Sequence, residues 1–207
     1  MELKEKKNNL IKHLIESGYL KTEKVIKAFK DVPRENFVRA GNKNYAYSDT
    51  PLSIGFGQTI SAPHMVAIMT EHLKPEKTDI VLEVGAGSGY QAAILSGLVM
   101  KVYTIELDPN LAEFAKSNLK HSGIKNVEVI QGDGSRGYPE KAPYDKIIIT
   151  CACHEIPNAL IDQLKTGGII EAPVGSSWRQ ELIVAIKTKK GLEEKNYGGC
   201  IFVPLRH

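Results

Sequence analysis

The pattern of apolar and polar residues along the chain predicts a seven-stranded sheet. The apolar run Ile80–Val84 is typical of a parallel strand buried on both faces, and the glycines after it allow a tight turn into a helix over residues 90–95. Shorter apolar runs predict the other strands, at residues 102–106, 127–130, 146–149, 169–173, 182–187 and about 200–204. We therefore expect an α/β fold with a mostly parallel, doubly wound sheet and helices on both faces.

Glycine and lysine residues mark the boundaries near the C-terminus. Gly167 and Gly168 separate a helix over residues 157–165 from the fifth strand, and Lys189-Lys190-Gly191 supplies a turn between the last two strands. The order of those two strands does not follow from the periodicity.

The first 38 residues predict two amphipathic helices that would pack on a sheet face or form a lid. The first helix ends at Gly18, and the second can be capped by Thr22 and is stopped by Pro33. Their apolar stripes are Leu10, Ile11, Leu14 and Ile15 in the first helix and Val25, Ile26 and Phe29 in the second.

Residues 36–58 show no regular periodicity and are too long for an ordinary connection, so they are a candidate functional loop. A helix then runs to about Leu73, with Pro63 in its first turn. Ser61 is a plausible N-cap of this helix, and a functional role for Ser61 is the alternative.

The ends of three predicted strands carry candidate chemistry. Gly85, Gly87 and Gly89 form a glycine-rich turn, Glu106 ends the second strand, and Asp133 follows the third between two glycines. Because ligands of doubly wound sheets bind outside the carboxyl ends of the strands, these residues describe one crevice. Glu106 lies at the spacing expected of an acid that accepts from ribose hydroxyls, and Asp133 could accept from an adenine amino group.

Two further residues bear on the ligand. Tyr90 stands where the dinucleotide-binding pattern needs glycine, which argues against a pyrophosphate. Glu83 is either part of the ligand site or a brace for the backbone N–H groups of the loop. A glycine-rich turn that serves only helix–strand packing is a third interpretation.

The order of these groups resembles class I S-adenosylmethionine-dependent methyltransferases, which have a Rossmann-like sheet. A more specific resemblance lies at residues 51–63, where Pro-Leu-x-Ile precedes Gly-x-Gly-Gln-Thr-Ile-Ser-x-Pro. This stretch is similar to the signature of the protein-L-isoaspartate O-methyltransferases. Val32-Pro33-Arg34-Glu35-Asn36-Phe37-Val38 also resembles a segment of that family, and the similarity covers roughly residues 25–205. Residues 150–154 depart from the family pattern, which has small residues followed by proline.

The resemblance implies methyl transfer from S-adenosyl-L-methionine to the free α-carboxyl of L-isoaspartyl residues in damaged proteins, with S-adenosyl-L-homocysteine as the product. It implies that Ser61 orients this carboxylate, with Thr59 and His64 as neighbours. The implied cofactor-binding residues are Gly85, Ala86, Gly87, Ser88, Glu106, Leu107, Asp133 and Gly134. A carboxylate with a pKa near ~4 is ionised at neutral pH, so no general base is expected.

Composition adds limits on partners and compartment. The 207 residues, 42% apolar and 25% charged, fit one domain, which divides into residues 1–75 with the substrate loop and residues 76–207 with the cofactor-binding core. A net charge of +3 and short lysine clusters favour solvated faces over a nucleic-acid-binding stripe. With no ~20-residue apolar run or signal-peptide core, we expect a cytoplasmic protein without membrane contact, as a monomer or weak homo-oligomer.

The three cysteines, Cys151, Cys153 and Cys200, form no paired framework. Together with His154 they raise the possibility of a metal site, but their spacing does not fit a closed zinc site, so we expect buried thiols and no metal.

Two other classes of function remain open at this stage. A class I methyltransferase of a small molecule or RNA would share the cofactor crevice and differ in residues 53–64. A catalytically silent binding module would also keep the fold.

Overall fold

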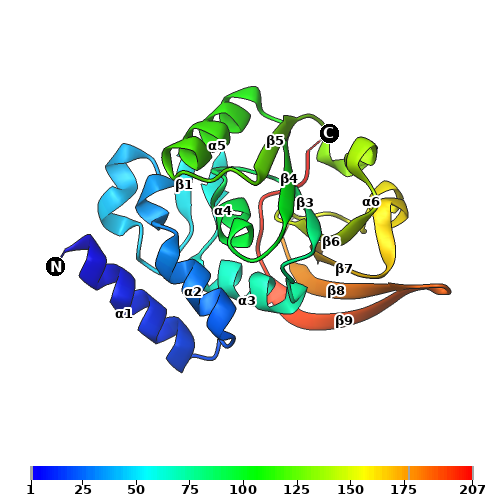
Figure 1. The fold of residues 1–207 in the computed structure, drawn as a ribbon, viewed down its shortest axis with the longest axis horizontal. Coiled ribbons are helices and arrows are strands. Elements are labelled where there is room, and N and C mark those ends of the chain that lie inside the picture. The colour runs from blue at the N-terminus through cyan, green and yellow to red at the C-terminus, as the bar shows by residue number, and fades with distance from the viewer. Residues whose placement is uncertain (1, 177, 207) are drawn as a thin grey trace.

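A computed structural model describes residues 2–176 and 178–206 of the chain. Its centre is a seven-stranded sheet in the order β5-β4-β3-β6-β7-β8-β9 (Figure 1). The strands are β3 (Ile80–Val84), β4 (Lys101–Glu106), β5 (Val127–Gln131), β6 (Tyr144–Ile149), β7 (Leu164–Gly175), β8 (Gln180–Thr188) and β9 (Gly191–Cys200). The first five strands in this order, from β5 across to β7, pair in parallel. Strands β8 and β9 are added by antiparallel pairing, so the expected mostly parallel sheet is confirmed.

Alternate strand residues point to opposite faces and build two apolar cores. Val81 and Val102 join one core, whereas Leu82 and Ile147 join the other. The first core is covered by α1 (Leu3–Glu16), α2 (Glu23–Asp31), α3 (Pro63–Leu73), α4 (Tyr90–Ser96) and α5 (Pro109–His121), and the second by α6 (Asn158–Gln163) (Figure 1). Helices therefore lie on both faces, as expected.

Helix α5 was not among the predicted elements. Asp108 caps it, because its carboxylate accepts from the N–H groups of Asn110 and Leu111.

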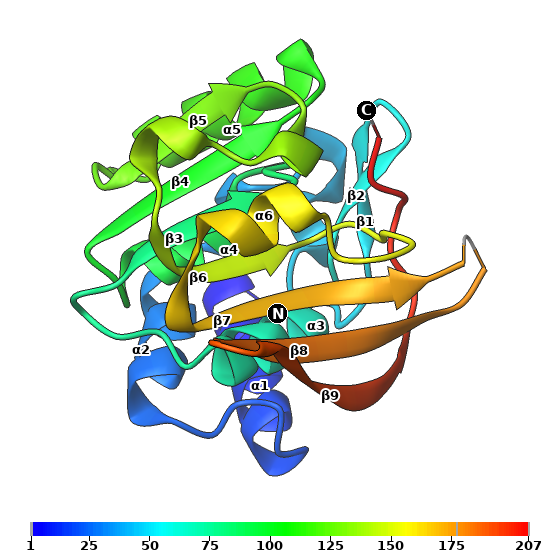
Figure 2. The same ribbon diagram turned by 90° about the vertical axis from the view of Figure 1, so that its right-hand side faces the viewer.

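The last strand is a correction to the sequence-based prediction. It occupies Gly191–Cys200 rather than residues 200–204, directly after the turn at residues 189–190. Because β9 is an edge strand with mostly exposed side chains, it has no apolar pattern to identify it. Residues 201–206 instead form a tail that bridges to Ala152 through Pro204 and runs beside the hairpin of β1 (Leu52–Gly55) and β2 (Gln58–Ile60) (Figure 2).

The two N-terminal helices are confirmed, but the capping of α2 differs from the prediction. Thr22 does occupy the N-cap position, yet its side chain makes no capping hydrogen bond. Glu71 in α3 instead holds the two residues that lead into α2, because its Oε1 accepts from the N–H groups of Lys21 (2.7 Å) and Thr22 (2.8 Å). This long-range contact ties α2 to α3.

The stretch predicted as an irregular loop at residues 36–58 contains short ordered elements. They are the end of η1 (Arg34–Asn36), η2 (Ala40–Tyr45) and the hairpin of β1 (Leu52–Gly55) and β2 (Gln58–Ile60). Among the helices of the described residues, none is long and apolar enough to cross a membrane.

Candidate functional site

A cavity of about 860 Å³, including its open mouth, lies at the carboxyl ends of β3 and β4. Strand β2 with Ser61 after it, the glycine-rich loop and the C-terminal tail complete its walls. The predicted site residues on the wall are Thr59, Ser61, Gly85, Ala86, Gly87, Ser88, Glu106, Leu107 and Gly134. The fold therefore brings the two predicted halves of the site, residues 59–61 and the strand ends, into one cavity.

The glycine-rich loop has a backbone that only glycine adopts without strain. Gly85 has a φ of 97°, and a Cβ there would lie 2.7 Å from the hydroxyl oxygen of Thr150. The N–H groups of Gly85 and Ala86 both donate to the carbonyl of Ile105, at 2.9 and 3.0 Å. These bonds hold the loop against the end of β4, whose last residue, Glu106, lines the cavity.

Glu106 is 7% exposed, and its carboxylate is fixed by the backbone. Its Oε2 accepts from Gly87 N at 2.8 Å and its Oε1 accepts from Asp108 N at 3.1 Å. A carboxylate oxygen has more than one lone pair, so each oxygen keeps capacity for a ligand hydroxyl. The geometry fits the predicted binding of a ribose diol.

Glu83 lies on the cavity wall and is fully buried. Neither of its carboxylate oxygens has a hydrogen-bond partner among the described residues, so the interpretation of Glu83 as a brace for the loop N–H groups is wrong. Burial raises the pKa of Glu83 to about 8; the nearby hydroxyl of Thr104 opposes this rise and the Glu106 charge adds to it. A buried acceptor without a partner beside a cavity fits a cationic or donor group of a ligand.

Asp133 is predicted to bind the cofactor but is not part of the cavity wall. Its Oδ1 accepts from the N–H (3.0 Å) and hydroxyl (2.7 Å) of Ser135, and its Oδ2 lies 3.4 Å from Arg136. These contacts stabilise the 3-10 turn η3 (Gly134–Arg136), a local preference of Asp that competes with ligand binding. Gly134, the next residue, does line the cavity.

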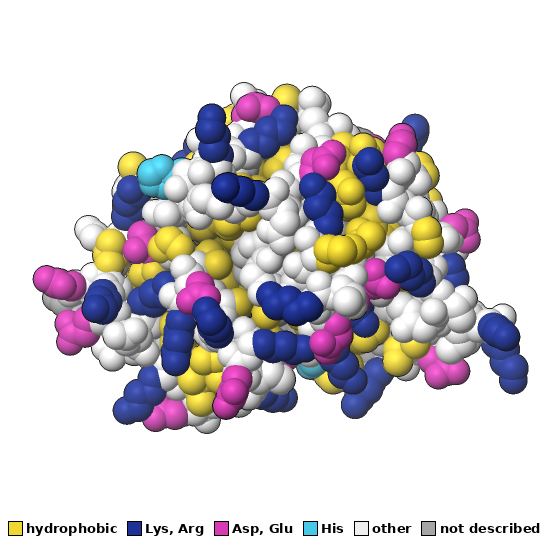
Figure 3. Space-filling model, viewed as in Figure 1, with side chains coloured by type: hydrophobic (Ala, Val, Ile, Leu, Met, Phe, Trp, Pro, Cys, Tyr) yellow, Lys and Arg dark blue, Asp and Glu magenta, His cyan; other side chains and the backbone are white. Residues whose placement is uncertain are grey.

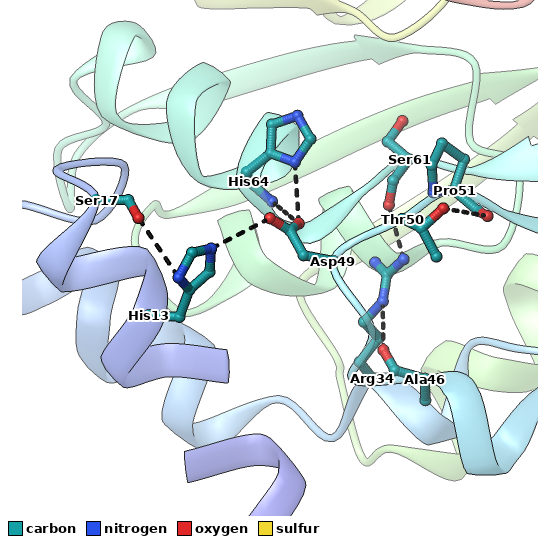
Figure 4. Close-up of polar contacts among 9 residues, drawn as sticks. All are labelled: His13, Ser17, Arg34, Ala46, Asp49, Thr50, Pro51, Ser61 and His64. Atoms are coloured by element: carbon teal, nitrogen blue, oxygen red, sulfur yellow. Dashed lines mark hydrogen bonds and ion pairs between the residues drawn. The ribbon is translucent and has the colours of Figure 1, made fainter. Parts of the chain in front are cut away.

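Ser61 lies on the cavity wall and outside helix α3 (Figure 4). The N-cap of α3 is Ala62, and no side chain makes a capping hydrogen bond from that position, so the prediction that Ser61 caps the helix is wrong. The backbone of Ser61 is held from another element, because its carbonyl accepts from Nη2 of Arg34 at 2.7 Å.

His64 is not brought to the cavity wall, although it was predicted to bind substrate. Its ring Nδ1 and its N–H both lie 2.9 Å from Oδ1 of Asp49 (Figure 4). Asp49 thereby satisfies an N–H in the first turn of α3 and holds the imidazole away from Ser61. The other oxygen of Asp49 lies 3.9 Å from His13 of α1.

Several contacts around the site have no local signal in the sequence. Arg34 binds the carbonyl of Ser61, 27 positions away, and Asp49 accepts from His64, 15 positions away. Pairings over such distances leave no local pattern. The C-terminal tail contributes residues 203–206 to the cavity wall. An extended tail without periodicity gives no reason to place it there.

All three cysteines are buried free thiols, as expected. Burial raises the pKa of Cys153 and Cys200 to about 11 and that of Cys151 further. Cys151 lines the cavity through its position next to the glycine-rich loop. Within residues 2–176 and 178–206, no group of three or more His, Cys, Asp or Glu side chains is arranged to hold a metal ion.

Comparison with known proteins shows the family of the chain. Residues 5–207 match the family model "Protein-L-isoaspartate(D-aspartate) O-methyltransferase (PCMT)". The chain is 50% identical over 214 residues to a protein-L-isoaspartate O-methyltransferase of Hyperthermus butylicus, covering 98% of this chain and 89% of the relative.

Two solved structures are also similar. One, a protein-L-isoaspartate O-methyltransferase, has a TM-score of 0.89 at 31% identity over 97% of this chain and 66% of its own. The other, from Plasmodium falciparum in complex with S-adenosyl-L-homocysteine, has a TM-score of 0.84 over 96% and 97% of the two chains; at 24% identity it shows the shared fold. The chain belongs to the protein-L-isoaspartate (D-aspartate) O-methyltransferase family, whose members are S-adenosylmethionine-dependent enzymes.

Proposed function

We propose that the chain methylates the free α-carboxylate of L-isoaspartyl residues in proteins, and that Ser61 orients this carboxylate. One observation carries the proposal: a single cavity is lined both by Ser61 of the family's signature stretch and by Glu83 and Glu106 at the strand ends. A methyl transfer needs acceptor and cofactor in one enclosed space, with the reacting atoms in line.

The residues at the strand ends fit S-adenosylmethionine. The two N–H bonds to Glu106 fix its carboxylate for the ribose hydroxyls. The buried carboxylate of Glu83, without a partner, suits the α-ammonium group of the methionine portion, while Gly85 and Gly87 allow close approach of the backbone. When bound, S-adenosylmethionine supplies a sulfonium methyl group that a carboxylate oxygen can accept.

The acceptor chemistry places few demands on the protein. A substrate carboxylate has a pKa near ~4 and is ionised at neutral pH, so no proton must be removed before it attacks. The side chains around Ser61 agree with this: His64 is bound to Asp49, and the Cys151 thiol has a raised pKa. Ser61 thus acts by donating a hydrogen bond that places the carboxylate, with Thr59 beside it on β2.

The two parts of the single domain have different roles in this proposal. Residues 1–75 contribute the substrate side of the cavity, and residues 76–207 contribute the cofactor side and the C-terminal tail. Asp133 would accept from the adenine amino group with the lone pairs that its bonds to Ser135 leave available. Three free thiols fit a reducing compartment such as the cytoplasm.

Isoaspartyl peptides and proteins are the partners in this proposal, and nucleic acid is not. Figure 3 shows positive and negative side chains interspersed on the face it presents, rather than a positive stripe. The protein acts as a monomer or weak homo-oligomer.

The test compares methyl incorporation into an isoaspartyl peptide, its aspartyl twin and a bulk RNA sample. Methylation of the isoaspartyl peptide alone is the expected result. Methylation of RNA, or of neither peptide, would contradict the proposed substrate.

A further inference from the structure

Arg34, in η1, is completely buried behind the wall of the cavity. Its Nε donates to the carbonyl of Ala46 at 2.9 Å and its Nη2 donates to the carbonyl of Ser61 at 2.7 Å (Figure 4). Its Cζ lies 4.8 Å from the ring centroid of Tyr90. Ser61 and Tyr90 both line the cavity, so Arg34 contacts two residues of the wall from the protein side.

The guanidinium of Arg34 makes no direct contact with a carboxylate among the described residues. Among the residues that the structure describes, no acid forms an ion pair with it within 4.0 Å, and its Nη1 has no hydrogen-bond partner. The nearby acids Glu35 and Asp49 make their hydrogen bonds to Tyr47 and His64 instead, so Asp49 acts on the guanidinium only through its charge at longer range. A guanidinium stays protonated even when buried, so this cation has no carboxylate in direct contact with it among the described residues.

A buried cation without a counter-ion is costly, and removing water strengthens its field. Two carbonyl contacts and an aromatic face offset part of the cost. The charge of Arg34 acts close to the cavity, because the guanidinium directly contacts Ser61 and Tyr90, which line it. An anionic ligand group held at Ser61 would complete the electrostatic balance.

We propose that Arg34 is a positioning residue for the methyl transfer: it fixes Ser61 through the main chain and supplies the buried positive charge that attracts the substrate carboxylate. This inference rests on the proposed function. The two contributions affect different kinetic constants. Since the carboxylate loses its charge as the ester forms, the cation favours the bound substrate at least as much as the transition state and acts on KM. The hydrogen bond to Ser61 sets the in-line placement of the carboxylate and acts on kcat.

Two substitutions separate these contributions. Arg34→Lys keeps a positive charge but not the planar pair of donors that reaches Ala46 and Ser61 together. We expect kcat for an isoaspartyl peptide to fall about ten- to a hundredfold while KM changes by less than about threefold. Arg34→Met removes charge and hydrogen bonds, so we expect a similar loss in kcat and a rise in KM of about tenfold or more.

Lys7→Met provides a matched control in the same N-terminal segment. Nζ of Lys7 donates to the carbonyls of Lys30 at 2.6 Å and Val32 at 3.2 Å, close in sequence to Arg34. Lys7 does not line the cavity. Its loss should lower the melting temperature without changing kcat or KM at temperatures where the protein is folded.

The measurements are thermal melts, the Kd of S-adenosylhomocysteine by calorimetry, and kcat and KM for the peptide with all four proteins. A second readout is inhibition by the same peptide with its α-carboxylate replaced by a carboxamide. The wild type and Arg34→Lys should prefer the carboxylate, and Arg34→Met should lose most of that preference.

A merely structural Arg34 gives a different result: both variants lose activity only in proportion to their folded fraction, with KM and carboxylate preference unchanged, as in Lys7→Met. That result overturns the inference. If Arg34→Met does not fold, Arg34→Lys decides, and an unchanged kcat per folded enzyme overturns it. A wild type that does not methylate the isoaspartyl peptide rejects the proposed function itself.

Discussion

Glu83 should make the stability of the protein without ligand depend on pH. Its pKa is about 8 in the folded protein, against 4.5 for an ordinary glutamate in the unfolded chain. Below pH 4.5 both states hold the proton and there is no penalty. Between pH 4.5 and 8 the folded state keeps a proton that the unfolded chain has released, so raising the pH favours unfolding. Above about pH 8 the penalty is complete.

The size of this effect follows from the interval between the two pKa values. At about 1.36 kcal/mol per pH unit, the interval from 4.5 to about 8 corresponds to about 5 kcal/mol of lost stability, of which about 3 kcal/mol is lost by pH 7. Domains of this size are stable by only about 5–15 kcal/mol, so the penalty is a large fraction of the total.

Glu83→Gln tests this reasoning because glutamine has a similar shape and cannot ionise. The unfolding free energies of the wild type and the variant are measured by urea denaturation from pH 5 to pH 8. We expect the difference to shift by about 4 kcal/mol in favour of the variant across this range. Replacing the carboxyl group by an amide has a cost in stability that is the same at every pH, so it cancels in that shift. The titration of the buried Glu171, whose pKa is also raised by burial, is common to both proteins and cancels as well. Parallel stability curves for the two proteins would refute the reasoning.

The same residue links cofactor binding to proton release. If the ligand ammonium group pairs with Glu83, binding favours the ionised carboxylate and releases a proton at pH 7. Calorimetric titration of S-adenosylhomocysteine in two buffers of different ionisation enthalpy measures this release. The Glu83→Gln variant, which has no proton to lose, is the control, and equal proton release by both proteins would contradict the assignment.

Three further predictions concern the other site residues and the thiols. Ser61→Ala should leave the unfolding free energy within ~0.5 kcal/mol, because Ser61 caps no helix, but lower single-turnover methylation about a hundredfold; a lowered melting temperature with normal turnover would contradict this. Glu106→Ala removes a charged acceptor worth ~1.5–3 kcal/mol, so S-adenosylhomocysteine should bind about ten- to a hundredfold more weakly in calorimetry, and unchanged affinity would reject the ribose contact. The thiols, with raised pKa values, should react with iodoacetamide at pH 8 only after unfolding, and Cys151→Ala with Cys153→Ala should retain turnover; rapid alkylation of the folded protein, detected by mass spectrometry, would contradict this.

The amino-acid sequence by itself determined the elements whose signal is local. The apolar run at β3, the glycine-rich turn after it and the carboxylate that ends β4 were all identified correctly, because strand periodicity and turn residues act over a few positions. The parallel order of these strands also follows, since it is the usual arrangement for alternating strands and helices. The resemblance at residues 51–63 led to the family, which the comparisons confirm.

Only the tertiary structure decided which side chains face the cavity. His64 and Asp133 lie beside cavity residues in the sequence, yet their hydrogen bonds turn them to Asp49 and Ser135. The carboxylate oxygens of Glu83 have no hydrogen-bond partner among the described residues because the packing of distant segments buries them away from water. The position of Arg34 also depends on tertiary packing, because its hydrogen bond to the carbonyl of Ser61 joins segments that are distant in sequence. Hydrogen-bond partners and burial depend on how distant segments pack, and no local pattern contains that information.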